Sequence, residues 1–344
     1  MYPPFVSPVR ELLKSNDVTL KFVDIGSRNG IIELANVAHF VDAYGFEPNP
    51  EEYKKLISGK TDAAIYGIKS PKYNSISYSP YAVGEVNGKH PFYITHGPGA
   101  AGMHEPDLDR LSEIRWKGKT YPKTMAEDLK VDEVVDVEVK TLATFAHEKK
   151  LDYVDYLKID VEGAEYEVLK GAGDLLNNVG VIKVEVCFIP MRKKQKLFSD
   201  VDLLLRKFGF DLLRYEISPA QIGLKERTAP WSFGPTVGFP ERFGQAVQAD
   251  AVYVNRSILD KKRNIAKAAV LLEKNYIDEA LFVLRRQAKI NEPEEFLSML
   301  QNYGGRWQTR LLEGTFKVAR RLLKPSASNW KQLTLNAKIV NFGQ

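Results

Sequence analysis

Short apolar runs alternate with helix-like stretches along most of this chain, and this alternation restricts its fold more than any other feature. Residues 20–26, LKFVDIG, form an apolar run that ends in a glycine, as a buried strand would. Residues 50–58, PEEYKKLIS, carry acids first and lysines later, which suits the dipole of a helix. The alternation predicts an α/β fold with a mostly parallel sheet covered by helices on both faces. Further strands are expected at 40–48, 179–188 and 250–255, a further helix at 198–210, and a hairpin at 84–95 around Asn87-Gly88.

Size and composition are those of a globular protein. The chain has 344 residues, of which 44% are hydrophobic and 27% are charged, and a length of roughly 150 residues per domain predicts two domains. The single cysteine, Cys187, lies in an apolar run and can form no internal disulfide. The N-terminus does not resemble a signal peptide, and no apolar run is long enough to cross a bilayer. We therefore expect a cytoplasmic protein.

The charge is unevenly distributed. From Arg256 to Lys331 the chain carries 16 Lys and Arg against 8 Asp and Glu, although the whole chain has a net charge of only +5. The remainder is slightly acidic, which argues against a nucleic-acid groove there. We predict a domain over residues 1–255 that carries the function, followed by a basic helical extension over residues 256–344.

The extension contains a segment with two distinct faces. At helical spacing over residues 307–324, the apolar side chains fall on one half and the basic side chains fall on the other. Two interpretations remain open. The apolar half can pack on the rest of the protein or on a protein partner, or the segment can attach peripherally to an anionic inner membrane surface.

Two motifs on consecutive predicted strands point to a nucleoside-containing cofactor. In VDIGSRNG (23–30), Asp24 ends a strand and glycines allow the backbone to approach a ligand closely. In GFEPNP (45–50), Glu47 ends the next strand, where an acid can accept hydrogen bonds from ribose hydroxyls. Arg28 stands where a dinucleotide-binding motif has its second glycine, which disfavours a pyrophosphate on this turn.

A third motif places acids at the end of a buried strand. In VDYLKIDVEGAEYEVLKGA (154–172), Lys158, Asp160 and Glu162 alternate, so they share a face if the strand continues that far. Glu185 interrupts the apolar run VIKVEVCF. Asp160 can also be a helix cap and Glu185 part of a structural ion pair. Together with Glu162, these carboxylates could instead hold a divalent cation, although no dedicated ligand spacing indicates one.

The order and spacing of four segments resemble the FkbM-type family of S-adenosylmethionine-dependent methyltransferases. The segments are VDIGSRNG, FEPNP, TLATFAHEKKLDYVDYLKIDVEGAEYEVLKGA and IKVEV, and the resemblance covers about residues 20–255. It implies a Rossmann-like methyltransferase fold in residues 1–255 and transfer of a methyl group to oxygen, frequently to a sugar hydroxyl of a glycan, glycolipid or natural product. The chain departs from the family's usual GANxG at Ser27 and Arg28.

The resemblance also implies positions for the cofactor S-adenosyl-L-methionine. Asp24, Gly26 and Gly30 would lie by its methionine part, Glu47 by its ribose and Ala82 near its adenine. The candidate cofactor-binding residues are Asp24, Gly26, Ser27, Asn29, Gly30, Glu47, Asn49 and Ala82.

The methyl acceptor, a small molecule or a glycan, needs a group that orients its hydroxyl or removes the proton. Asp160 is the first choice, and Glu162, Glu185 and His96 are further catalytic candidates; His104 is an alternative base in the same loop as His96. Two rival functions are a nicotinamide-dependent oxidoreductase and a cofactor-binding scaffold without methyl transfer activity.

Overall fold

A computed structural model describes residues 3–68, 70–115, 124–216, 222–225 and 245–290. The chain divides into two compact units, Met1–Asn291 and Glu292–Gln344. The predicted two-faced segment at 307–324 lies outside the described residues. No helix within the described ranges is long and apolar enough to cross a membrane.

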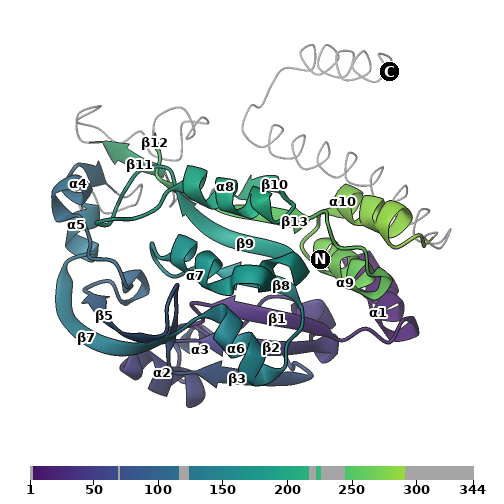
Figure 1. Cartoon of the computed structure of the whole chain (residues 1–344). Coiled ribbons are helices and arrows are strands. Elements are labelled where there is room, and N and C mark those ends of the chain that lie inside the picture. The colour runs from purple at the N-terminus through teal and green to yellow at the C-terminus, as the bar shows by residue number, and fades with distance from the viewer. Residues whose placement is uncertain (1–2, 69, 116–123, 217–221, 226–244, 291–344) are drawn as a thin grey trace, which may run out of the picture. The chain divides into compact units, whose positions relative to one another are not determined.

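A seven-stranded sheet forms the centre of the first unit, in the order β10-β13-β9-β8-β1-β2-β3. The strands from β9 to β3 pair in parallel, whereas β13 and β10 join antiparallel at one edge. The parallel strands end on the left of Figure 1. The α/β fold expected from the alternation is confirmed. The strands are β1 (Leu20–Ile25), β2 (Val41–Phe46), β3 (Ser75–Ser79), β8 (Val154–Ile159), β9 (Val179–Cys187), β10 (Phe210–Glu216) and β13 (Gln248–Asn255).

Three helices cover one face of this sheet: α6 (Leu142–Lys149), α7 (Glu165–Ala172) and α8 (Phe198–Lys207), with the 3-10 helix η3 (Gly173–Asn178) after α7. Their apolar side chains and those of the strands form one buried cluster, and each fully buried side chain contributes roughly 1.5–3 kcal/mol. Members of this cluster include Val23, Leu157 and Ile182 from the sheet and Phe145, Val168 and Leu205 from the helices.

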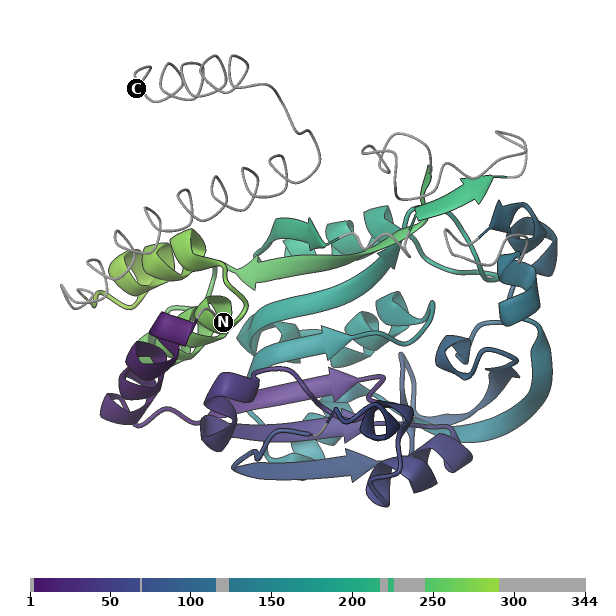
Figure 2. The ribbon, with the colours of Figure 1, turned by 180° about the vertical axis from the view of Figure 1, so that it is seen from behind.

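The helices α1 (Pro3–Ser15) and α9 (Lys261–Glu273) lie side by side, as Figures 1 and 2 both show. Helix α9 packs on β8 and β9 and is followed by α10 (Ile277–Phe282) and the π-helical turn η6 (Val283–Gln287). The described part of the predicted extension therefore belongs to the same compact unit as the sheet. The functional boundary after residue 255 stays a prediction.

A buried ion pair joins α9 to the sheet. Arg263 donates from Nη1 to both carboxylate oxygens of Asp155 in β8, each at 3.0 Å, and its guanidinium lies 3.6 Å from the ring centroid of Tyr153. Asp155 is 2% exposed. Burial raises the pKa of its carboxyl to about 6, and the charge of Arg263 opposes this rise.

We expect Arg263→Ala to lower the free energy of unfolding by about 3 kcal/mol at pH 8, because it leaves a buried carboxylate without its cation. The loss should be smaller at pH 5, where protonation neutralises Asp155. Urea unfolding at both pH values measures this. The matched control is Lys262→Ala, which removes an exposed ion pair with Asp17 and should change stability by less than about 0.5 kcal/mol. Equal losses of unfolding free energy in the two variants would contradict a stabilising role for the buried pair of Arg263 and Asp155.

Smaller elements build the region beyond the carboxyl ends of the parallel strands. A second sheet has the order β4-β7-β5, formed by β4 (Ala82–Val83), β7 (Val131–Lys140) and β5 (Gly88–Thr95). The hairpin predicted at Asn87-Gly88 is wrong, because β4 and β5 each pair with β7 and not with each other. Asn87 instead accepts a hydrogen bond from the amide of Thr141 at 2.7 Å, at the start of α6.

The remaining described elements are short. A third sheet has the order β12-β11-β6. Its strands are β6 (Ile114–Arg115), β11 (Ile222–Lys225) and β12 (Gln245–Ala246); the helices are η1 (Ala35–Phe40), α2 (Pro50–Ile57), α3 (Asp62–Ile65), η2 (Pro98–Ala100), α4 (Leu108–Ser112) and α5 (Met125–Asp128).

Candidate active site

A pocket of about 310 Å³ opens at the carboxyl ends of β1, β2 and β8. This is the edge at which open α/β sheets bind their ligands. Every residue that we predicted from the sequence to bind the cofactor lines this pocket, and so do Asp160 and Glu162. The predicted cofactor-binding residues in the lining are Asp24, Gly26, Ser27, Asn29, Gly30, Glu47, Asn49 and Ala82.

The turn after β1 lies directly against the end of β8. Gly26 has φ +94°, and a Cβ atom on it would lie 1.8 Å from the backbone oxygen of Asp160, so no larger residue fits. The amide of Asp160 donates to the carbonyl of Ile25 at 2.9 Å. These contacts bring the predicted cofactor turn next to Asp160, the residue predicted to orient or deprotonate the methyl acceptor.

One lysine connects the acids of the two strands. Lys158 Nζ lies 3.3 Å from Asp24 Oδ1 and 3.3 Å from Asp160 Oδ2. Burial raises the pKa of Asp24 to about 6, while the positive charge of Lys158 acts in the opposite direction. Lys158 therefore fixes the relative positions of the two carboxylates and offsets part of their charge.

Glu47 directly follows β2, lines the pocket and is 5% exposed. Its Oε1 accepts a hydrogen bond from the amide of Asn49 at 2.8 Å, and Asn49 in turn caps the N-terminus of α2. Burial raises the pKa of the Glu47 carboxyl to about 7. An ionised carboxylate has about four acceptor positions, so Glu47 keeps the capacity to bind hydroxyl groups.

The second sheet and the loop after β5 contribute an apolar wall to the pocket. Its members are Ala82, Val83, Phe92 and Met103. Apolar walls with a few placed polar groups are typical of small-molecule sites, and this wall suits a flat aromatic group.

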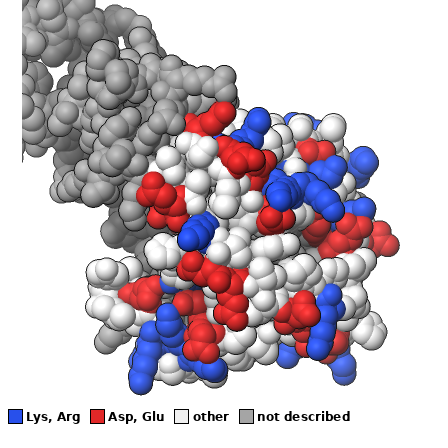
Figure 3. Space-filling model, turned by 90° about the vertical axis from the view of Figure 1, so that its left-hand side faces the viewer, with Lys and Arg blue, Asp and Glu red and all other residues white. Residues whose placement is uncertain are grey.

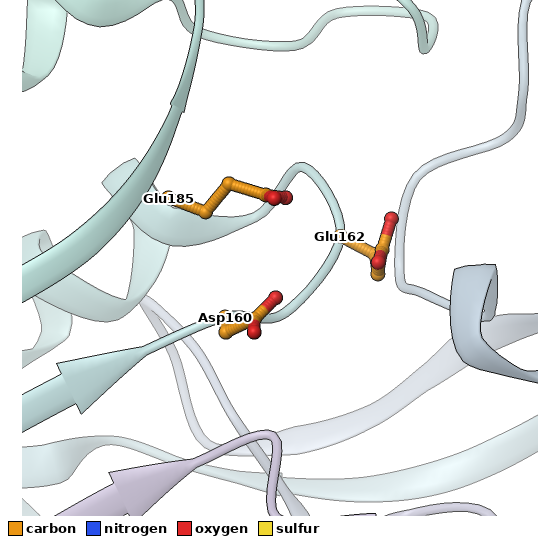
Figure 4. Close-up of side chains that lie close together, drawn as sticks. All are labelled: Asp160, Glu162 and Glu185. Atoms are coloured by element: carbon orange, nitrogen blue, oxygen red, sulfur yellow. The ribbon is translucent and has the colours of Figure 1, made fainter. Parts of the chain in front are cut away.

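The carboxylates of Asp160, Glu162 and Glu185 gather beside the pocket, with oxygens that lie within 4.8 Å of one another (Figure 4). Glu162 has φ +60°, an unusual conformation for a residue other than glycine. Burial raises its pKa to about 7, and Arg192 opposes this rise. Burial and the charges of Asp160 and Glu162 raise the pKa of Glu185 well above its ordinary value.

The three acids differ in pKa and in exposure, and these differences decide which of them can contact a hydroxyl group in the pocket. The raised pKa shifts Glu185 towards its protonated form, and its Oε1 already accepts a hydrogen bond from Gln248 at 2.7 Å. Asp160 is the most accessible, with 39% of its side chain exposed. Of the three, Asp160 is thus best placed to meet a hydroxyl in the pocket.

The three carboxylates also have the spacing and hard oxygen ligands that suit a divalent cation. All three already have protein partners: Lys158 for Asp160, Arg192 for Glu162 and Gln248 for Glu185. A divalent cation at this position stays an alternative that the sequence leaves open and does not indicate.

The structure does not bring His96 to the pocket lining. Its side chain is 67% exposed, and Nδ1 lies 3.3 Å from Asp132 on β7. His104 also lies outside the lining and forms an ion pair with Glu167, which raises its pKa. A raised pKa leaves a smaller fraction of His104 in the unprotonated form that can accept a proton.

Sequence reasoning missed Arg192, which is 2% exposed. Its Nη2 donates to Ala100 O at 2.7 Å and to Glu162 at 3.1 Å, and Nη1 donates to His104 O at 3.3 Å. Arg192 therefore holds the loop beside the pocket against the turn after β8. It lies in the basic run MRKKQK, which gives no signal that separates it from solvated neighbours.

Acidic and basic side chains are interspersed over the face at which the parallel strands end (Figure 3), but acids outnumber bases in the pocket lining. Asp160 and Glu162 belong to the pocket at these strand ends. The site therefore favours ligands that carry positive charge or hydrogen-bond donors.

Comparisons with known proteins identify this region with a family. A family model described as "Methyltransferase FkbM domain" matches residues 24–212. Methyltransferase sdnD from Sordaria araneosa is 30% identical over 210 residues, which cover 56% of this chain and 74% of that protein.

Two solved structures of methyltransferases are similar at a much lower sequence identity. Magnesium protoporphyrin IX methyltransferase from Synechocystis has 10% identity and a TM-score of 0.29, with 72% of this chain and 76% of that chain covered. Precorrin-6y C5,15-methyltransferase from Geobacter metallireducens also has 10% identity and a TM-score of 0.29, with 73% and 88% covered. Because the TM-scores and identities are this low, the fold is assigned from the strand order of the central sheet and not from these two structures.

Proposed function

Because this chain belongs to the FkbM family of methyltransferases, we propose that its pocket binds S-adenosyl-L-methionine and that it methylates an acceptor hydroxyl. The observation that carries this proposal is the convergence on one pocket of the cofactor candidates from β1 and β2 with Asp160 from the end of β8.

The pocket offers a suitable group for each part of the cofactor. Glu47 would accept hydrogen bonds from the ribose hydroxyls, and the wall that contains Ala82 and Phe92 would take the adenine. Asp24 and the turn at Gly26 would hold the methionine part, whose amino group is a hydrogen-bond donor.

S-adenosylmethionine supplies a methyl group that its positive sulfur already activates. The protein therefore mainly has to align an acceptor oxygen with that methyl group. Asp160 would accept the hydrogen bond of the acceptor hydroxyl and take its proton as the new carbon–oxygen bond forms, while the carbon–sulfur bond breaks and S-adenosylhomocysteine leaves. Lys158 would keep Asp160 in place through the contact at 3.3 Å.

The acceptor that we propose is a sugar hydroxyl of a glycan, glycolipid or natural product. Several carboxylates beside the pocket can accept hydrogen bonds from a compound with many hydroxyl groups. Tritium transfer from methyl-labelled S-adenosylmethionine to a panel of sugars, with amines and carboxylic acids as comparison, tests this class. Transfer to the amines or acids alone would contradict it.

Calorimetric titration distinguishes the proposed function from its rivals. We expect one site per chain for both S-adenosylmethionine and S-adenosylhomocysteine, and no binding of NAD. Binding of NAD alone would indicate an oxidoreductase. Binding of S-adenosylhomocysteine without transfer to any acceptor of the panel would favour a cofactor-binding scaffold.

A further inference from the structure

Arg28, at which the chain departs from the family's usual turn, makes a set of contacts that the proposed function does not use. Its Nε lies 2.7 Å from Glu52 Oε2 in α2, and its Nη2 pairs with Asp62 in α3. The neighbouring Asn29 accepts a hydrogen bond from the amide of Ala63 at 3.4 Å. The cofactor turn is thus tied to both helices that follow β2.

The partner of Arg28 in α2 is a buried acid close to the proposed ribose site. Glu52 is 5% exposed, and the side chain of Asn49 accepts a hydrogen bond from its amide at 3.3 Å. The amide of Asn49 in turn donates to Glu47. Glu47 and Glu52 are therefore both hydrogen-bonded to the cap residue Asn49, and the negative charge of each disfavours that of the other.

Glu52 has two cationic partners of different kinds. Arg28 has 20% of its side chain exposed and lines the pocket, whereas Lys55 has 44% of its side chain exposed and lies 2.7 Å from Glu52 Oε1. An accessible ion pair is weakened by solvent, so Arg28 should supply most of the compensation for Glu52.

We propose that Arg28 is a positioning residue for cofactor binding: it offsets the charge of Glu52 beside Glu47 and holds the cofactor turn against α2 and α3. In this role it acts through Glu47 and makes no hydrogen bond of its own to the cofactor. The electrostatics agree, because the charge of Glu52 raises the pKa of Glu47 and the charge of Arg28 lowers it.

The proposal rests on the proposed binding of S-adenosylhomocysteine, and calorimetry with this compound at pH 7.5 tests it. We expect Arg28→Met to weaken binding by about tenfold, because Glu52 is left uncompensated next to Glu47. The double variant R28M/E52Q should return to within about threefold of the parent, because the uncompensated charge is gone. The affinity of Arg28→Lys should lie between those of R28M and R28M/E52Q, because a lysine ammonium cannot reproduce the two-sided pairing of the guanidinium with Glu52 and Asp62.

Lys55→Met is the matched control, since it removes the other cation of the same carboxylate. It should bind within about threefold of the parent. Thermal melts check that each variant is folded. If R28M does not fold, R28K and R28K/E52Q take the places of the single and double variants, with the same rescue expected.

The outcomes separate the two hypotheses. A parent protein that does not bind S-adenosylhomocysteine overturns the proposed function. A parent that binds it, with R28M equally tight, overturns the role of Arg28. Weak binding that E52Q does not restore overturns the role as well, and would indicate that Arg28 contacts the cofactor directly.

Discussion

Asp160→Asn is expected to slow methyl transfer by about 100- to 10,000-fold, the range typical of a lost proton acceptor. Affinity for S-adenosylhomocysteine should change little. The amide keeps the shape of the carboxylate and keeps an oxygen for Lys158, which lies 3.3 Å away. The backbone contacts of this position with Ile25 and Gly26 do not involve the side chain. Single-turnover transfer to an accepted sugar, together with calorimetry, measures both quantities.

A matched control for this variant is Asp132→Asn. Asp132 is an exposed acid on β7 that contacts His96 outside the pocket lining. It should leave transfer within about twofold of the parent, because it changes charge at a distance that solvent screens. Unchanged transfer by Asp160→Asn would reduce this residue to a structural part of the turn.

Glu47→Ala is expected to weaken the binding of S-adenosylhomocysteine by about 30- to 1,000-fold, or about 2–4 kcal/mol, through the loss of two hydrogen bonds to a charged acceptor. The control on the same stretch is Glu51→Ala, in α2. Its side chain is 74% exposed and pairs with Lys54, so its removal should have no measurable effect on binding. If Glu47→Ala binds as tightly as the parent, the assignment of the ribose site is wrong.

The raised pKa of Glu47 predicts how the binding of S-adenosylhomocysteine depends on pH. The pKa of Glu47 is raised to about 7, so the free protein holds a proton there below that pH. Ribose hydroxyls would donate to the charged form, and binding would then release the proton. Affinity should therefore rise between pH 6 and pH 8, and this rise should shrink in Glu47→Ala. Asp24, with a pKa of about 6, would retain a smaller dependence at the acidic end.

Sequence patterns were informative wherever local chemistry dictates the structure. Periodic apolar runs predicted the strands, and the charge order of residues 50–58 predicted α2, as the structure confirms. The turn chemistry at Asn87-Gly88 was misleading, because the side chain of Asn87 instead accepts a hydrogen bond from the amide of Thr141, the N-cap residue of α6. A side chain that can serve a turn can equally serve a helix terminus, and only the tertiary contacts select between them.

The sequence by itself determined the α/β architecture and which strand ends carry the acids, because parallel strands bring their carboxyl ends to one edge. Only the tertiary structure decided which charges compensate one another. Arg28, Arg192 and Arg263 are far in sequence from Glu52, Glu162 and Asp155, and an arginine in a charged run looks the same whether it is solvated or buried. The cost of burying a charge depends on partners that long-range packing supplies, and local sequence contains no record of them.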